Sequence, residues 1–228
     1  MADEVEAVHA SITVDAVCKA LDSLGVSDRK ASTAATEEPA ACSRPRKSFG
    51  GVLGQTSVIR PFLLLGGKWS AGDVNRLRQH NVTHIVNVTA QIPNSFPSEF
   101  AYLNIRIPDA DTVDISRHFE SACAFISACR DRQGTVLVHC SAGMSRSVTI
   151  VLAFLMRAES MSLIAALELV KSKRHMVSPN AGFMRQLVEL ELKLYGTTSI
   201  DLSAYEQNRW LKVGQLVPPS QYSDSQHE

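Results

Sequence analysis

The feature that most constrains this chain is an apolar strand that runs directly into a short loop and then into a helix. Residues 136–138 are Val-Leu-Val, typical of a buried strand, and residues 145–156 repeat apolar positions with helical spacing. Between them lies a loop that begins with Cys140 and ends with Arg146. This order predicts that Cys140 lies at the carboxyl end of a strand and faces the N-terminus of the helix.

Such a placement suits a cysteine that attacks a bound anion. A helix N-terminus presents unpaired N–H groups and partial positive charge, which lower the pKa of a thiol and attract an oxyanion. The small residues Ser141, Ala142 and Gly143 allow successive backbone N–H groups to turn toward one tetrahedral anion. Arg146 can pair with two phosphate oxygens through its planar guanidinium, and Ser147 can donate its hydroxyl to the sulfur.

Taken one at a time, these residues have plainer explanations. A lone cysteine after a strand is most often a small buried hydrophobe, and a lone arginine at a helix start is usually a surface charge. A rhodanese-type sulfur carrier also places a cysteine at the head of an anion-binding loop, but nothing in that chemistry calls for the arginine and serine found here. The complete pattern of His139, Cys140, five residues, Arg146 and Ser147 therefore favours a nucleophilic site.

The stretch from His139 to Ser147 resembles the signature of the cysteine-based protein phosphatases, in the Ser-Arg-Ser form of the dual-specificity phosphatases. The resemblance runs from about Ile59 to about Tyr195. It includes the segments 62–66, 85–88, 102–109, 153–156 and 178–183. It implies an α/β fold with a central, mostly parallel sheet of four to five strands flanked by helices. It also implies an enzyme that hydrolyses phosphotyrosine and phosphoserine or phosphothreonine.

The resemblance also implies roles for individual residues. Cys140 is the nucleophile, Arg146 binds phosphate, Asp109 is the general acid and base, and Ser147 stabilises the thiolate. The phosphate-binding loop consists of Ser141, Ala142, Gly143, Met144, Ser145 and Arg146. A leaving oxygen needs a proton, so the segment after the strand near Tyr102 must supply an acid. Asp111 is the second candidate, although it and Asp114 also fit a solvated turn or a helix cap.

Two further residues have supporting roles. His139 can hydrogen-bond the loop backbone, and we interpret it as an orienting residue rather than a base. The resemblance implies that Asn180 braces the catalytic region, whereas the sequence alone requires only that it cap a helix. Cys123 and Cys129 are predicted to be core thiols, and whether either protects Cys140 through a disulfide stays open.

Composition sets the broad class. With 228 residues, 45% of them hydrophobic, the chain has enough core for one domain and some chain left over. The 23 basic and 23 acidic residues balance, so no net charge points to nucleic acid or to an acidic membrane. Five scattered cysteines favour a reducing compartment. The start is acidic and no apolar run reaches spanning length, so we expect no signal peptide and no membrane insertion.

These features predict a cytoplasmic protein, with the nucleus as a second location. We expect no cofactor and no metal, because Arg146 and the loop dipoles supply the positive field that phosphate requires. The predicted domains are an N-terminal helix and flexible linker over residues 1–50, the catalytic domain over 51–198, and a C-terminal appendage over 199–228 with a short helix at Tyr205–Val213. Trp69 is predicted to be a packing residue rather than a substrate platform.

The residues of the phosphate-binding loop also indicate which class of substrate the protein binds. The interior of this loop lacks the lysine of lipid phosphatases, and Ser145 stands where glucan phosphatases usually carry glycine. No long tyrosine-bearing recognition loop is visible, which predicts a shallow pocket and a phosphorylated protein as substrate. The basic cluster at residues 44–47 resembles a kinase docking motif, although solvated charge in a loop is the far more common explanation of such a cluster. The alternative to an enzyme is a non-catalytic phosphoprotein-binding or scaffold module on the same fold. The sequence leaves the oligomeric state open.

Overall fold

The structure, a computed structural model, describes residues 54–209 and 215–216. The predicted N-terminal helix, the linker and the basic cluster at residues 44–47 lie outside the described residues, so these expectations stay predictions. Within the described ranges, no helix is both long enough and apolar enough to cross a bilayer.

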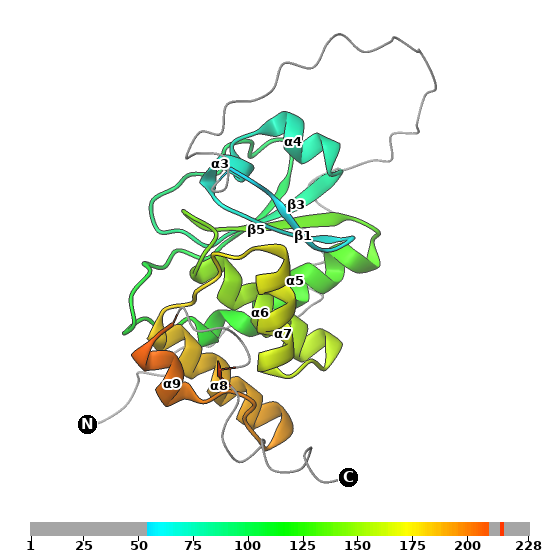
Figure 1. The fold of residues 1–228 in the computed structure, drawn as a ribbon. Helices are drawn as coiled ribbons and strands as arrows, with labels where there is room; N and C mark the ends of the chain where they lie inside the picture. Colours follow the sequence, from blue (N-terminus) through cyan, green and yellow to red (C-terminus); the bar gives the residue numbers. More distant parts are fainter. Residues whose placement is uncertain (1–53, 210–214, 217–228) are drawn as a thin grey trace, which may run out of the picture. The chain divides into compact units, whose positions relative to one another are not determined.

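A five-stranded sheet in the order β1-β2-β5-β3-β4 forms the centre of the fold (Figure 1). Its strands are β1 (Ser57–Arg60), β2 (Leu63–Gly66), β3 (Val82–Asn87), β4 (Ala101–Asn104) and β5 (Thr135–His139). β1 pairs antiparallel with β2, and all other neighbours are parallel. The predicted α/β class with a mostly parallel sheet of four to five strands is confirmed.

Helices cover both faces of the sheet (Figure 1). The helices are α3 (Lys68–Ala71), α4 (Val74–Gln79), η1 (Ser116–His118), α5 (Phe119–Asp131), α6 (Arg146–Glu159), α7 (Leu163–Lys173), α8 (Ala181–Tyr195) and α9 (Leu202–Gln207). On one face, α3 and α4 pack over a core that includes Leu64, Ile85 and Leu137. On the other face, α5 and α6 contact β5, and α7 and α8 pack against α6.

The position of the central strand β5 accounts for the continuous apolar run in its sequence. β5 lies between β2 and β3, and Val136, Leu137 and Val138 are completely buried. A strand covered on both faces has no polar side to alternate with, so it is a continuous apolar run. Gly66 of β2 and Asn87 of β3 both pair with His139, so three strands end level with one another. The loop that follows His139 therefore emerges at the carboxyl edge of the sheet.

The prediction for Trp69 is wrong. Its side chain is 61% exposed, and the Lys68 ammonium lies 4.9 Å from the centre of its ring. The helix α3 is only one turn long, and it buries the small residues Ser70 and Ala71 instead. Asp73 then begins the separate helix α4 by accepting a hydrogen bond from the backbone N–H of Arg76.

The helix predicted at Tyr205–Val213 starts earlier, at Leu202, and ends at Gln207. Asp201 sets this start, because its side chain accepts a hydrogen bond from the backbone N–H of Ala204. Tyr205 is completely buried and its hydroxyl donates to the carbonyl of Pro179 at 2.7 Å. The described part of the segment after residue 198 thus packs on the residues that precede α8.

Candidate active site

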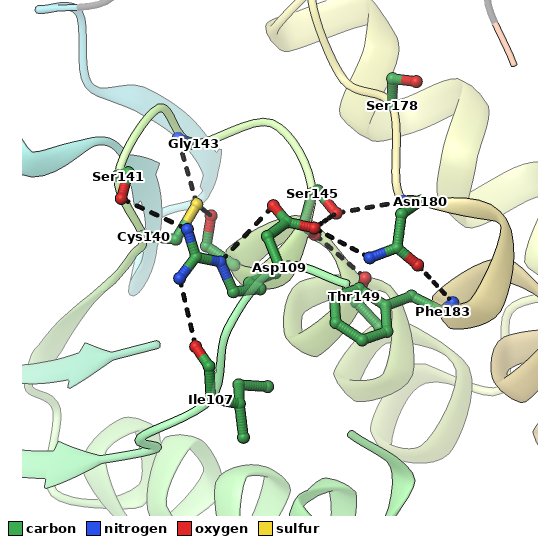
Figure 2. A network of polar contacts seen from close by, with 12 residues as sticks. Ile107, Asp109, Cys140, Ser141, Gly143, Ser145, Thr149, Ser178, Asn180 and Phe183 are labelled. Carbon is green, nitrogen blue, oxygen red and sulfur yellow. Dashed lines mark hydrogen bonds and ion pairs between the residues drawn. The ribbon is translucent and has the colours of Figure 1, made fainter. Parts of the chain in front are cut away.

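Cys140 lies immediately after β5, as the first residue of the loop that leads into α6 (Figure 2). It is only 2% exposed. Two donors point at its sulfur: the backbone N–H of Gly143 and the hydroxyl of Ser147, each 3.2 Å from Sγ. Donors aimed at sulfur favour a thiolate, which is the form that acts as a nucleophile.

Gly143 is required by the shape of the loop. Its φ is +71°, in the left-handed region that favours glycine. A Cβ at this position would also lie 2.5 Å from the carbonyl oxygen of Gly66. The loop can therefore turn tightly enough to bring the N–H of residue 143 over the sulfur only with glycine there.

Backbone N–H groups from outside the loop donate to two of its carbonyl groups and hold these carbonyls facing away from the interior of the loop. The backbone N–H of Lys68 donates to the Ser141 carbonyl at 3.0 Å, and that of Ser178 donates to the Met144 carbonyl at 2.9 Å. In a trans peptide the N–H points away from the C=O of the same unit. Holding these carbonyls outward therefore turns the N–H groups of Ala142 and Ser145 toward the inside, where an oxyanion would lie.

Arg146 connects the loop to the segment that carries the candidate acids. Its side chain is 9% exposed. One terminal nitrogen donates to the Ile107 carbonyl at 3.2 Å, and the other donates to the hydroxyl of Ser141 at 3.3 Å. Its Nε is buried without a hydrogen-bond acceptor among the described residues, although it lies 3.5 Å from Oδ2 of Asp109. This N–H is a donor that a phosphate oxygen would satisfy.

Asp109 is the acid that the fold brings to the loop. Its Oδ1 accepts hydrogen bonds from the Ser145 hydroxyl and from Nδ2 of Asn180, both at 2.8 Å (Figure 2). Its Oδ2 lies 3.5 Å from Nε of Arg146. Its side chain is 33% exposed, so a substrate can reach it. Asp111, the second candidate, is exposed. Its backbone instead contacts α8 at Gly182, where a Cβ would lie 1.8 Å from the Asp111 carbonyl oxygen.

Asn180 makes contacts that are compatible with both of the roles considered for it. Its Oδ1 accepts from the backbone N–H of Phe183 at 2.8 Å, which caps α8. Its Nδ2 donates to Asp109, and its backbone N–H donates to the Ser145 hydroxyl at 3.0 Å. One residue therefore ties the start of α8 to both the phosphate loop and the candidate acid.

The remaining histidine and cysteines have environments that fit their predicted places. His139 is 2% exposed, its Nδ1 lies 3.3 Å from the Cys140 carbonyl, and burial lowers its pKa to about 4. It is therefore neutral at physiological pH. Cys123 and Cys129 lie in the core as free thiols, as predicted, and burial raises their pKa values to about 12 and about 11. Both remain protonated, unlike the thiolate that nucleophilic attack requires.

The structure thus gathers Cys140, Ser141, Gly143, Ser145, Arg146, Ser147, Asp109 and Asn180 into one site. Sequence reasoning missed one residue here: Arg174, whose guanidinium donates to the loop carbonyls of Ala142 and Gly143. The only signal was a basic residue at the end of a predicted helix, which is common on protein surfaces. Among residues 54–209 and 215–216, no three His, Cys, Asp or Glu side chains cluster as metal ligands.

Comparison with known proteins agrees with this geometry. Residues 63–193 match the profile of a family described as "Dual specificity phosphatase, catalytic domain". Mouse dual specificity protein phosphatase 19 is 46% identical over 133 residues, which cover 58% of this chain and 60% of the relative. The chain therefore spans less than two thirds of that relative's length.

Two solved structures are similar in fold. Human DUSP28 aligns with a TM-score of 0.59 and 36% identity, covering 61% of this chain and 94% of its own. A mouse putative dual specificity phosphatase, solved with zinc tungstate, aligns with a TM-score of 0.61 and 32% identity, covering 68% of this chain and 96% of its own. With the matched profile spanning more than half of its length, the chain belongs to the dual specificity phosphatase family and carries that family's catalytic domain.

Proposed function

We propose that this chain is a protein phosphatase that removes phosphate from phosphotyrosine and from phosphoserine or phosphothreonine, through a phosphocysteine formed on Cys140. One observation carries the proposal: a buried cysteine with two donors on its sulfur lies in the same site as Arg146 and Asp109. Membership of the family supports it.

In the first step, the thiolate of Cys140 attacks phosphorus and forms a P–S bond while the bond to the leaving oxygen breaks. The loop N–H groups and Arg146 hold the other three phosphate oxygens, where charge is concentrated in the transition state. Asp109, in its protonated form, gives its proton to the leaving oxygen.

In the second step, water attacks the phosphocysteine and the P–S bond breaks. Asp109, now ionised, takes a proton from the water, and the hydroxyl of Ser147 stabilises the departing thiolate. The contact of Asp109 with Ser145 and Asn180 keeps its carboxylate beside the loop in both steps. Inorganic phosphate and the free cysteine are the products.

Phosphate release from a peptide phosphorylated on both threonine and tyrosine tests the proposal, with a chelator and a reductant present. Loss of both phosphates supports a dual-specificity cysteine phosphatase. Tight binding of the peptide without any turnover would overturn the proposal in favour of a phosphoprotein-binding module.

Asp109→Asn is expected to lower turnover of a phosphoserine peptide by about 100-fold, because an alkoxide leaves poorly without a proton. The loss should be much smaller for 4-nitrophenyl phosphate, whose leaving group needs no protonation. Asp111→Asn is the matched control and should retain native turnover of both substrates. Equal losses in the two variants, measured as kcat on each substrate, would contradict the assignment of the acid to Asp109.

We also propose that Trp69 contacts the peptide next to the phosphorylated residue. The helix α3 begins against the catalytic loop, through the Lys68 N–H bond to Ser141, and it leaves the ring of Trp69 exposed with Lys68 beside it. An exposed tryptophan beside a catalytic loop offers apolar area to a bound peptide, and the ammonium favours acidic peptide residues.

Trp69→Ala is therefore expected to lower kcat/KM for a phosphopeptide with acidic flanking residues by about fivefold, the loss of roughly 1 kcal/mol of contact. Turnover of 4-nitrophenyl phosphate should stay native, because that substrate has no flanking residues. Val58→Ala, a change at another exposed apolar side chain, is the control. A loss on both substrates, or on neither, would reject this contact.

A further inference from the structure

Arg174 is a charged residue buried behind the catalytic loop, directly after α7. It is 4% exposed. Its Nε donates to the Gly143 carbonyl at 2.8 Å, one terminal nitrogen donates to the Ala142 carbonyl at 2.9 Å, and the other donates to the Gln55 carbonyl at 2.9 Å. All three partners are neutral carbonyls, and no carboxylate among the described residues forms an ion pair with it.

These bonds decide which way two peptide units of the loop face. The carbonyl of Ala142 points out to Arg174, so the N–H of Gly143 in the same trans peptide points in the opposite direction. It donates there to the sulfur of Cys140 at 3.2 Å. The Gly143 carbonyl is held in the same way, which turns the Met144 N–H inward. Arg174 thus fixes the direction of two consecutive N–H donors of the loop, because it bonds the carbonyl of the same peptide unit in each case.

The charge of Arg174 acts on the same sulfur. Burial lowers the pKa of Arg174, and its attraction to Cys140 raises that pKa in return. A guanidinium keeps its proton at all physiological pH values, even when it is buried. The contact to the sulfur itself is made by the N–H of Gly143, which Arg174 holds in place through the carbonyl of Ala142.

The other described polar side chains around Cys140 do not bond the carbonyls of Ala142 and Gly143. Arg146, from α6, is the second cation, but Asp109 faces it at 3.5 Å and offsets part of its charge. His139, from β5, is neutral because burial lowers its pKa to about 4. Ser147, from α6, contributes a dipole through its hydroxyl and no net charge. Among the described residues, the side chain that bonds the carbonyls of Ala142 and Gly143 is that of Arg174.

We propose that Arg174 is a positioning residue: through two loop carbonyls it orients backbone N–H groups of the catalytic loop toward the sulfur of Cys140 and toward the bound phosphate. The inference rests on the proposed function, because it assigns a role within that reaction. It adds a second arginine that acts from outside the phosphate site, through backbone carbonyls.

Alkylation of Cys140 by iodoacetamide tests the donor that Arg174 holds on the sulfur, since it reports the reactivity of the sulfur and needs no turnover. The full chain is compared with Arg174→Met, Arg174→Lys and the control Lys173→Met, which removes an exposed neighbouring charge. We expect Arg174→Met to alkylate about five- to tenfold more slowly than the native chain at pH 6, because the N–H of Gly143 would no longer be held on the sulfur. Lys173→Met should match the native chain.

Binding of sodium tungstate tests the orientation of the donors. Arg174→Lys retains a charge, but an ammonium cannot bond the two loop carbonyls as a guanidinium does. We expect tungstate affinity to fall about tenfold in both Arg174 variants, and both to alkylate more slowly than the native chain.

Native alkylation and native tungstate affinity in a folded Arg174→Met protein would overturn the inference. If that variant does not fold, Arg174→Lys decides alone, and an unchanged tungstate affinity in it would overturn the inference. Failure of the proposed function has a different result: the native chain would alkylate and bind tungstate but would release no phosphate from peptides.

Discussion

Cys140→Ser is expected to lower phosphopeptide turnover by at least about 10⁴-fold while peptide binding persists. A serine hydroxyl is not ionised near neutral pH, so the N–H of Gly143 and the hydroxyl of Ser147 would have no thiolate to stabilise. The change is nearly isosteric and leaves Arg146 and the loop N–H groups in place. We therefore expect the phosphopeptide dissociation constant to stay within a few-fold of the native value.

Cys123→Ser is the matched control for this result. Its thiol is also buried, but burial raises its pKa to about 12 and it lies on α5, outside the site. Turnover by this variant should stay native at a temperature well below unfolding. Residual turnover above about one per cent in Cys140→Ser would show that another group can act as the nucleophile.

Arg146→Lys is expected to lower kcat by about 10³-fold and to raise the KM of phosphopeptides. Three nitrogens of the Arg146 side chain face three directions, toward Ile107, Ser141 and Asp109. A single ammonium cannot keep the contacts to Ile107 and Ser141 and also offer a second donor to phosphate. The loss should therefore appear both in substrate binding and in the transition state.

Arg157→Lys provides the control, because Arg157 lies exposed in the last turn of the same helix. Steady-state kinetics of the two variants on one phosphopeptide measure the difference. A kcat of Arg146→Lys within tenfold of native would mean that positive charge alone suffices and that the geometry of the guanidinium adds little.

The sequence predicted the centre of the site because that part is local. The strand, the loop and the helix are continuous in the chain, and their residue types alone imply a thiolate beside a helix N-terminus. The mostly parallel sheet also follows from its alternating apolar and helical segments. The catalytic roles of Cys140, Arg146, Asp109 and Ser147 stay predictions, and the contacts in the structure support them.

The sequence was less informative about site residues that come together only through contacts between distant parts of the chain. Asp109 lies 36 residues before Ser145 and 71 residues before Asn180, so the residue pattern alone could not choose it over Asp111; the family resemblance did. Arg174 contacts backbone carbonyls about 30 residues away, and backbone acceptors leave no trace in a residue pattern. Trp69 was misjudged because tryptophan is usually well buried, whereas the single turn of α3 buries its small neighbours.

The most direct test of the account is to trap the phosphoenzyme. The native chain would be mixed with a phosphotyrosine peptide, quenched with acid within milliseconds, digested and analysed by mass spectrometry for phosphate on cysteine. The account predicts phosphate on the fragment that contains Cys140 and none in Cys140→Ser. Rapid turnover with no phosphate on Cys140, or with phosphate on another residue, would contradict it.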